Sequence, residues 1–238
     1  MLDLADLDFR LDRLAHRRDT LPETATLAVL TRRQAQVADL LVAAQTEDSD
    51  VGREQLKAEA DVEAVRSRAV RDQQRLDAGQ VSSAKELESL SHEIVSLARR
   101  QAELEDTVLE IMERREAAQT RAAELAAERD TIAADLVTVR AARDAALAEI
   151  ESESATLGGE RATLAGGLSG EFVALYDKIR AATTGGVGAA ALRRGSCEGC
   201  RMQLSTTDLS VIKAAPEDLV IRCEECRRIL VRVADSGL

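Results

Sequence analysis

The sequence LESLSHEIVSLARRQAELEDTVLEI, residues 87–111, decides the fold, because its apolar side chains recur at alternating intervals of three and four residues. The alternation continues without a change of register to Leu157, and 16 of the 21 positions that it visits are apolar. This repeat of 3.5 residues predicts a helix that supercoils left-handedly around a partner helix. Residues 27–76 carry a second run of the same kind, and residues 4–14 carry a short one.

Cap and stop residues separate these runs. Thr20-Leu21-Pro22-Glu23 pairs a candidate N-cap threonine with a glutamate three residues later, and residues 83–86 repeat the pattern with serine. Gly79 supplies a helix stop between the long runs. We therefore expect an antiparallel coiled-coil hairpin over residues 1–168, with a short helix at 2–19, a long helix at 21–76, a tip near 77–83 and a long helix at 84–168.

Four polar residues interrupt the apolar positions of the second long run at intervals of fourteen residues: Gln101, Arg115, Arg129 and Arg143. Long side chains at such positions can reach solvent and fix the register of the pairing. Their regular spacing also suits a contact surface for a partner. The sequence alone leaves both interpretations open.

The composition supports a helical fold and excludes a membrane span. The chain has 238 residues, no tryptophan, only three other aromatic residues and two prolines, which is typical of long helices. No uncharged apolar stretch approaches eighteen residues. The N-terminus, Met1–Asp6, is acidic and lacks the features of a signal peptide, so we expect a cytoplasmic protein.

The net charge of −11 is unevenly distributed. From Gly185 onward eight basic and seven acidic residues give +1, whereas the first 184 residues carry 24 basic and 36 acidic residues, a net charge of −12. An acidic hairpin repels nucleic acid. Any nucleic-acid contact is therefore expected on the C-terminal part of the chain.

Residues 169–184 are expected to form an amphipathic connecting helix and a joint. Phe172, Leu175, Tyr176 and Ile179 recur at helical spacing, which predicts packing against the hairpin or the C-terminal domain in preference to a ligand site. The glycine-rich residues 184–188 are expected to be a flexible joint.

Two C-x-x-C pairs in residues 185–238 predict a small β-rich C4 zinc ribbon. Their ligands are Cys197, Cys200, Cys223 and Cys226, with 22 residues between the pairs. Two such turns complete a tetrahedron of thiolates, whereas a redox dithiol usually comes as one pair. Strands are expected at 202–204, 219–222 and 229–233, and a helical turn at 206–212.

No fifth ligand is in view, since the two histidines lie far away in the hairpin. We therefore expect one structural Zn²⁺ with no open position. No nucleophile–base set, phosphate loop or carboxylate pair is evident, so we expect neither an enzyme nor a small-molecule substrate.

Three blocks in this order give the chain a family resemblance: GQVSSAKEL at 79–87, FVALYDKIR at 172–180, and CEGC at 197–200 with CEECRRIL at 223–230. The chain resembles bacterial coiled-coil proteins that end in a C4-type zinc ribbon. The resemblance implies a hairpin with a ribbon at its base, no known catalysis, and an adaptor role toward transcription or export components, with nucleic-acid binding also proposed. Ribbons often have glycine after the second cysteine; Arg201 and Arg227 stand there instead, which disfavours a tight left-handed turn.

Two functions remain in competition. The first is a non-enzymatic scaffold or adaptor for protein partners, and the second is RNA or DNA binding through the ribbon. Either could use six arginines close to the cysteines: Arg193, Arg194, Arg201, Arg222, Arg227 and Arg228. The absence of aromatic residues after Tyr176 removes base stacking and favours the protein partner. A transcription factor of the secondary-channel kind should carry paired acidic residues at the tip, and only Asp77 lies near Gly79.

Overall fold

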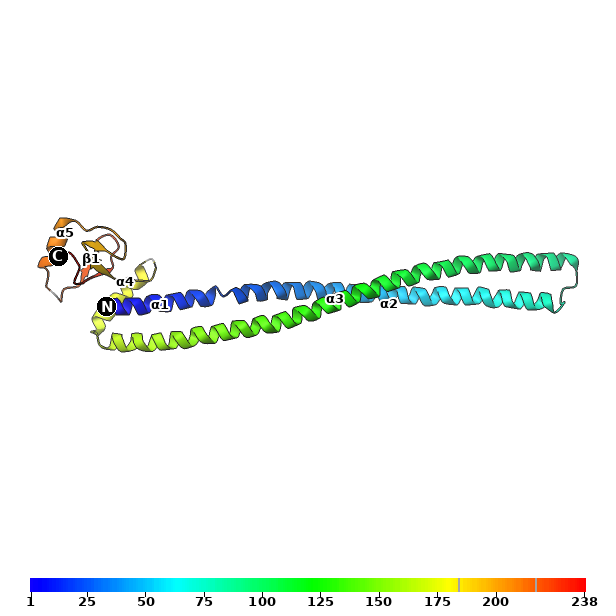
Figure 1. The fold of residues 1–238 in the computed structure, drawn as a ribbon, viewed down its shortest axis with the longest axis horizontal. Coiled ribbons are helices and arrows are strands. Elements are labelled where there is room, and N and C mark those ends of the chain that lie inside the picture. The colour runs from blue at the N-terminus through cyan, green and yellow to red at the C-terminus, as the bar shows by residue number, and fades with distance from the viewer. Residues whose placement is uncertain (184, 217) are drawn as a thin grey trace. The chain divides into compact units, whose positions relative to one another are not determined.

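A computed structural model describes residues 1–183, 185–216 and 218–238. The chain is mainly helical: α1 (Leu2–Asp19) and α2 (Pro22–Asp77) pack on α3 (Ala84–Gly166), and α4 (Gly170–Ala182) leads into a small four-stranded domain (Figure 1). Backbone contacts divide the chain into a first unit, residues 1–25 with 140–238, and a second unit, residues 26–139. None of the described helices has a segment long and apolar enough to cross a bilayer.

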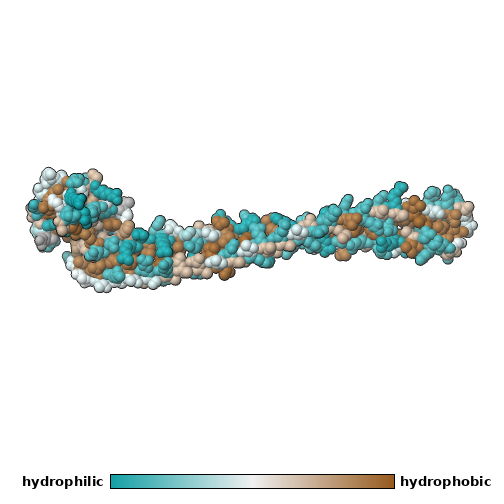
Figure 2. Space-filling model, viewed as in Figure 1, coloured by the Kyte–Doolittle hydropathy of each residue, from teal (hydrophilic) through white to brown (hydrophobic). Residues whose placement is uncertain are grey.

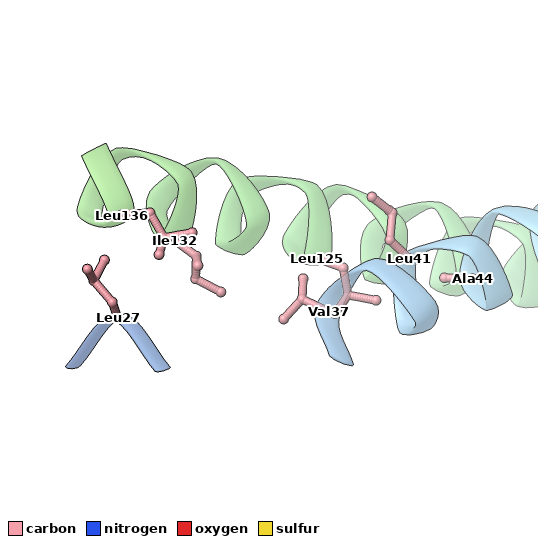
Figure 3. Packing of buried hydrophobic residues seen from close by; sticks show 7 residues of the cluster. All are labelled: Leu27, Val37, Leu41, Ala44, Leu125, Ile132 and Leu136. Atoms are coloured by element: carbon pink, nitrogen blue, oxygen red, sulfur yellow. The ribbon is translucent and has the colours of Figure 1, made fainter. Parts of the chain in front are cut away.

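The second unit is held together by the apolar positions of the heptad repeat. Leu27, Val37, Leu41 and Ala44 of α2 face Leu125, Ile132 and Leu136 of α3 (Figure 3). The spacing of three and four residues places these side chains on one stripe of each helix, where burial in the partner helix removes them from water. The mainly helical hairpin that the sequence predicts is confirmed.

The hairpin turns around Gly79, whose φ of 64° lies in the left-handed region that glycine adopts without strain. The helix after the turn begins with a serine cap, because the N–H of Glu86 donates to Ser83 Oγ at 3.2 Å. The Glu86 carboxylate reaches back to the N–H of Ser82 at 3.3 Å. These local interactions stop one helix at Asp77 and start the next at Ala84.

One of the four polar seam residues, Arg115, bonds across the hairpin. Its Nε donates to Asp48 at 3.3 Å and its Nη1 donates to Gln55 at 3.0 Å. Gly52 lies against this guanidinium, and a Cβ there would stand in van der Waals contact with it, 3.4 Å from Arg115 Cζ. This polar layer fixes one pairing register.

The other three polar seam residues bond along their own helix among the residues that the structure describes. Gln101 donates to Glu105, Arg129 to Asp130 and Arg143 to Asp144. Of these four residues, only Arg115 therefore forms a polar layer between α2 and α3.

In the first unit Leu7 and Leu14 of α1, together with Leu21 in the connection to α2, pack against Ile150 and Leu157 of α3. The expected N-cap role of Thr20 is wrong. Thr20 instead closes the C-terminus of α1, because its hydroxyl donates to the His16 carbonyl at 2.7 Å. The same carbonyl also accepts from the Thr20 backbone N–H at 3.0 Å, so both donors of Thr20 bond the last turn of α1.

The C-terminal sheet has the strand order β2-β1-β4-β3. Its strands are β1 (Ala189–Arg193), β2 (Ser196–Cys197), β3 (Ile221–Arg222) and β4 (Ile229–Arg232), with α5 (Thr206–Ala214) between β2 and β3. The strands β3 and β4 form the expected antiparallel pair. The strand expected at 202–204 is reduced to a single bridge between Gln203 and Ser196.

The strand β1 lies parallel to β4 in the middle of the sheet and had no counterpart in the sequence analysis. It begins directly after the segment expected to be a joint, in which Thr184 lies outside the described residues. Its alanines are buried. In the same unit, Tyr176 and Ile179 of α4 pack with Leu4 of α1, Ala189 of β1 and Ile229 of β4. The connecting helix thus packs against both the hairpin and the ribbon.

Candidate metal centre

Both cysteine pairs lie in turns of the same geometry. The N–H of Arg201 donates to the Cys197 carbonyl at 2.7 Å, and the N–H of Arg227 donates to the Cys223 carbonyl at 2.9 Å. The two arginines have φ of 62° and 63°. The left-handed turn therefore forms at both knuckles without glycine, at a cost of about 1–2 kcal/mol for each arginine.

The four sulfur atoms form a cluster of the size that zinc requires. The Sγ atoms of Cys197 and Cys226 lie 3.8 Å apart, and so do those of Cys200 and Cys223. All four lie within 4.8 Å of one another. A regular tetrahedron with Zn–S bonds of about 2.3 Å has edges of about 3.8 Å. The cluster is a C4 zinc site that suits one structural Zn²⁺, and the bound ion would cross-link the two turns.

The protein environment controls the protonation of these thiols. Burial raises the pKa of Cys197 to about 12, although backbone N–H groups of its own turn favour the thiolate. Burial also raises the pKa of Cys223. At Cys226 burial acts in the same direction, but the backbone N–H and the guanidinium of Arg228 outweigh it and lower the pKa to about 7. Zinc binds thiolates, so N–H groups directed at sulfur prepare the site for the metal.

Arg228 also holds the two halves of the ribbon together. Its Nε donates to the Val187 carbonyl at 3.0 Å and its Nη1 donates to the Gly199 carbonyl at 3.1 Å. The close approach requires glycine at 199, since a Cβ would stand 2.7 Å from Arg228 Cδ and 2.9 Å from Ala190 Cβ. Arg228 is therefore part of the metal domain's framework.

Comparisons with known proteins agree with this geometry. The profile of the CT398-like coiled coil hairpin domain matches residues 4–184, and that of the C4-type zinc ribbon domain matches residues 196–230. The chain belongs to the CT398-like hairpin family.

Relatives cover nearly the whole chain of this CT398-like protein. An uncharacterized protein of Mycobacterium tuberculosis is 37% identical over 98% of this chain and 94% of the relative. A solved structure from Mycobacterium smegmatis has 34% identity and a TM-score of 0.78, covering 97% of this chain and 94% of that one. The structure of CT398 from Chlamydia trachomatis, at 16% identity, shares the fold with a TM-score of 0.68 over 98% of this chain and 95% of that one.

The six ribbon arginines of this CT398-like chain differ in what they contact. Arg193 pairs with Glu198 at 2.9 Å and with Asp235 at 3.1 Å. Arg222 donates to the Arg227 carbonyl at 2.9 Å. With Arg228, these are occupied within the domain. The side chains of the remaining three are exposed and have no hydrogen bond or ion pair among the described residues: Arg194, Arg201 and Arg227.

A buried ionic network in the first unit was not foreseen from the sequence. Asp8 of α1 is fully buried. Its carboxylate accepts from Arg161 Nε at 2.6 Å and from the Tyr176 hydroxyl at 2.9 Å, and lies 3.3 Å from Arg180 Nη1. Burial and the bond to Asp8 raise the pKa of Tyr176 above its ordinary value. The network joins α1, α3 and α4, and its partners lie about 150 residues or more from Asp8, too far for any local sequence pattern to reveal.

Proposed function

We propose that this chain is a non-enzymatic scaffold or adaptor that mediates protein–protein interactions of a regulatory or transcription-related kind. The observation that carries the proposal is the gathering of four thiols within 4.8 Å of one another, because four thiolates would fill every position of a tetrahedral zinc. A closed C4 site stabilises a surface and does not supply chemistry. The long helices offer further surface for partners.

Protein contact is favoured over nucleic-acid contact on the ribbon. Of the six ribbon arginines, only Arg194, Arg201 and Arg227 have side chains without partners among the described residues, so the basic surface is smaller than the six arginines suggested. From Gly185 onward the formal charge is +1, and four thiolates with one Zn²⁺ bring it to about −1. No aromatic residue follows Tyr176 to stack on bases. The three arginines suit a small acidic protein surface better than an extended phosphate track.

A triple variant tests this proposal in the source cell. Arg194→Ala with Arg201→Ala and Arg227→Ala should lose at least one protein that co-purifies with the wild type, without losing zinc. The matched control removes three exposed arginines of the hairpin, Arg53, Arg99 and Arg121, and should retain those proteins.

Nucleic-acid binding predicts a different result in the same purification. The zinc-loaded protein would then recover RNA or DNA that nuclease releases, with an affinity that falls steeply as salt rises. The triple variant would flatten that salt dependence. Submicromolar binding with these properties would overturn the adaptor proposal.

A further inference from the structure

The two sides of the α2–α3 hairpin differ in chemistry. The heptad positions are lettered a to g, with Leu27 and Leu87 at position a. In this lettering, the ion pairs between the helices join residues at position g: Arg33–Glu128, Glu54–Arg114 and Arg68–Glu93. In residues 27–76 and 87–139, all described, 12 of the 14 g positions are charged. Only 3 of the 14 e positions are charged, and the rest are mostly alanine, glutamine and other small or neutral residues.

The e positions share one side of the hairpin with the b positions of both helices. Glu59, Glu63 and Arg66 of α2 and Glu105 and Leu109 of α3 line one hollow, which contains e and b residues from each helix. We call this side the e/b face. Ten large apolar side chains are exposed in residues 26–139, and seven of them belong to the e/b face: Val42, Leu56, Val70, Val95, Leu109, Met112 and Val137. Figure 2 shows that apolar patches alternate with hydrophilic ones on the visible surface of the helices.

These side chains recur every fourteen residues. The interval separates Val42, Leu56 and Val70 on α2, and the same interval connects Val95, Leu109, Ala123 and Val137 on α3. Fourteen helical residues rise about 21 Å.

The two series also coincide in level. Arg115 bonds Asp48 and Gln55, so its level corresponds to residues 51–52 of α2. Equal steps from there toward the tip bring Leu56 within about one and a half residues of the level of Leu109, and bring Val70 equally close to the level of Val95. The e/b face thus presents paired apolar side chains at a constant spacing of about 21 Å.

The charges on the e/b face are almost all acidic. Its e and b positions between residues 28 and 137 include one basic residue, Arg66, which already pairs with Glu63 and Glu105. The acidic residues number seven: Glu59, Glu63, Asp77, Glu88, Glu105, Glu116 and Asp130. The hollow beside Leu109 has the buried Val62 in its lining and glutamates around it. Such a site suits an apolar side chain that has cationic neighbours.

We infer that the e/b face binds one basic amphipathic helix of a partner protein, which would form a three-helix bundle with α2 and α3. A helix fits because the apolar pairs follow the heptad period and the small e residues permit close approach. A second copy of this chain would bring acidic residues against acidic residues, which charge repulsion opposes. The inference rests on the proposed adaptor function and specifies a partner for it.

A designed peptide tests the inference on the full-length, zinc-loaded protein. The probe is a helical peptide of about 28 residues, long enough to span about 42 Å and so three apolar levels. It carries leucine at intervals of three and four residues, with lysine beside them. The control peptide replaces each lysine with glutamate. Fluorescence anisotropy should show binding of the lysine peptide that weakens with salt, and much weaker binding of the glutamate peptide.

Paired variants locate the binding. Leu56→Gln with Leu109→Gln should weaken the lysine peptide at least about tenfold, because both leucines lose apolar contact area. Val29→Gln with Leu40→Gln changes exposed apolar residues at c and g positions and should leave the affinity within about twofold. Equal loss in both variants, or equal binding of the two peptides, would overturn the inference.

Photo-crosslinking in the source cell tests whether a natural partner occupies the e/b face. A crosslinker at residue 56 or 109 should capture a peptide from a basic amphipathic helix, whereas one at residue 40 should not. Capture of a second copy of this chain, or of an acidic segment, would overturn the inference. The ribbon triple variant tests the adaptor function separately, because its three arginines lie outside the e/b face.

Discussion

The replacement Asp8→Ala is expected to destabilise the first unit by about 3 kcal/mol. Removing one partner of a buried ion pair costs about 3–5 kcal/mol, because the remaining charges stay buried. Asp8 is fully buried and takes contacts from Arg161, Tyr176 and Arg180. The lower end applies because Arg161 keeps Asp177 and Arg180 keeps Asp12 as partners, each at 2.6 Å.

Tyr176 provides the assay, since it is the chain's only tyrosine and tryptophan is absent. Its fluorescence therefore reports unfolding of this network. With a urea dependence of about 2 kcal/mol per molar, a loss of 3 kcal/mol lowers the unfolding midpoint by about 1.5 M. Asp12→Ala is the matched control; its carboxylate is 44% exposed, so the change should cost less than about 1 kcal/mol. Equal midpoints for the two variants would refute the stabilising role of the buried network.

Three further predictions address the seam, the zinc and the tyrosine. Leu125→Ala, at a buried seam position, should lower the free energy of unfolding by about 2–5 kcal/mol, measured by thermal unfolding with circular dichroism. Leu109→Ala, at a side chain that is 57% exposed, should lower it by less than about 0.5 kcal/mol. Similar losses in the two variants would contradict the heptad register. Cys223→Ser should lose zinc and unfold the ribbon while the helical signal barely changes; full zinc occupancy would contradict the ligand set. In the folded chain Tyr176 should ionise at a pH above its ordinary pKa of about 10. The free energy of unfolding should therefore fall as the pH rises above 10, because the tyrosine of the unfolded chain ionises first. Identical tyrosinate absorbance titrations with and without denaturant would contradict this prediction.

The hairpin and the zinc ligands were predictable because each depends on a short repeated rule. A heptad pattern needs only apolar side chains at fixed intervals, and Leu125 or Val37 obeys it whatever lies elsewhere. Two C-x-x-C pairs specify a metal site by ligand chemistry and spacing alone.

The central strand β1 and the buried network were not predictable in this way. The alanines at 189–191 have a low strand propensity, and only pairing with β4 makes them a strand. Asp8 looks like another acidic residue of an amphipathic helix, because nothing near it in the sequence indicates Arg161. Likewise, the sequence could not show which of the six ribbon arginines lack a partner, because that depends on the contacts that the folded domain makes.

X-ray absorption at the zinc edge of the full-length protein tests the closed metal site most directly. Four sulfur neighbours at about 2.3 Å, without nitrogen or oxygen in the first shell, are the expected result. Fewer sulfurs together with an oxygen or nitrogen neighbour would show an open coordination position, and would contradict both the structural role of the zinc and the non-enzymatic function inferred from it.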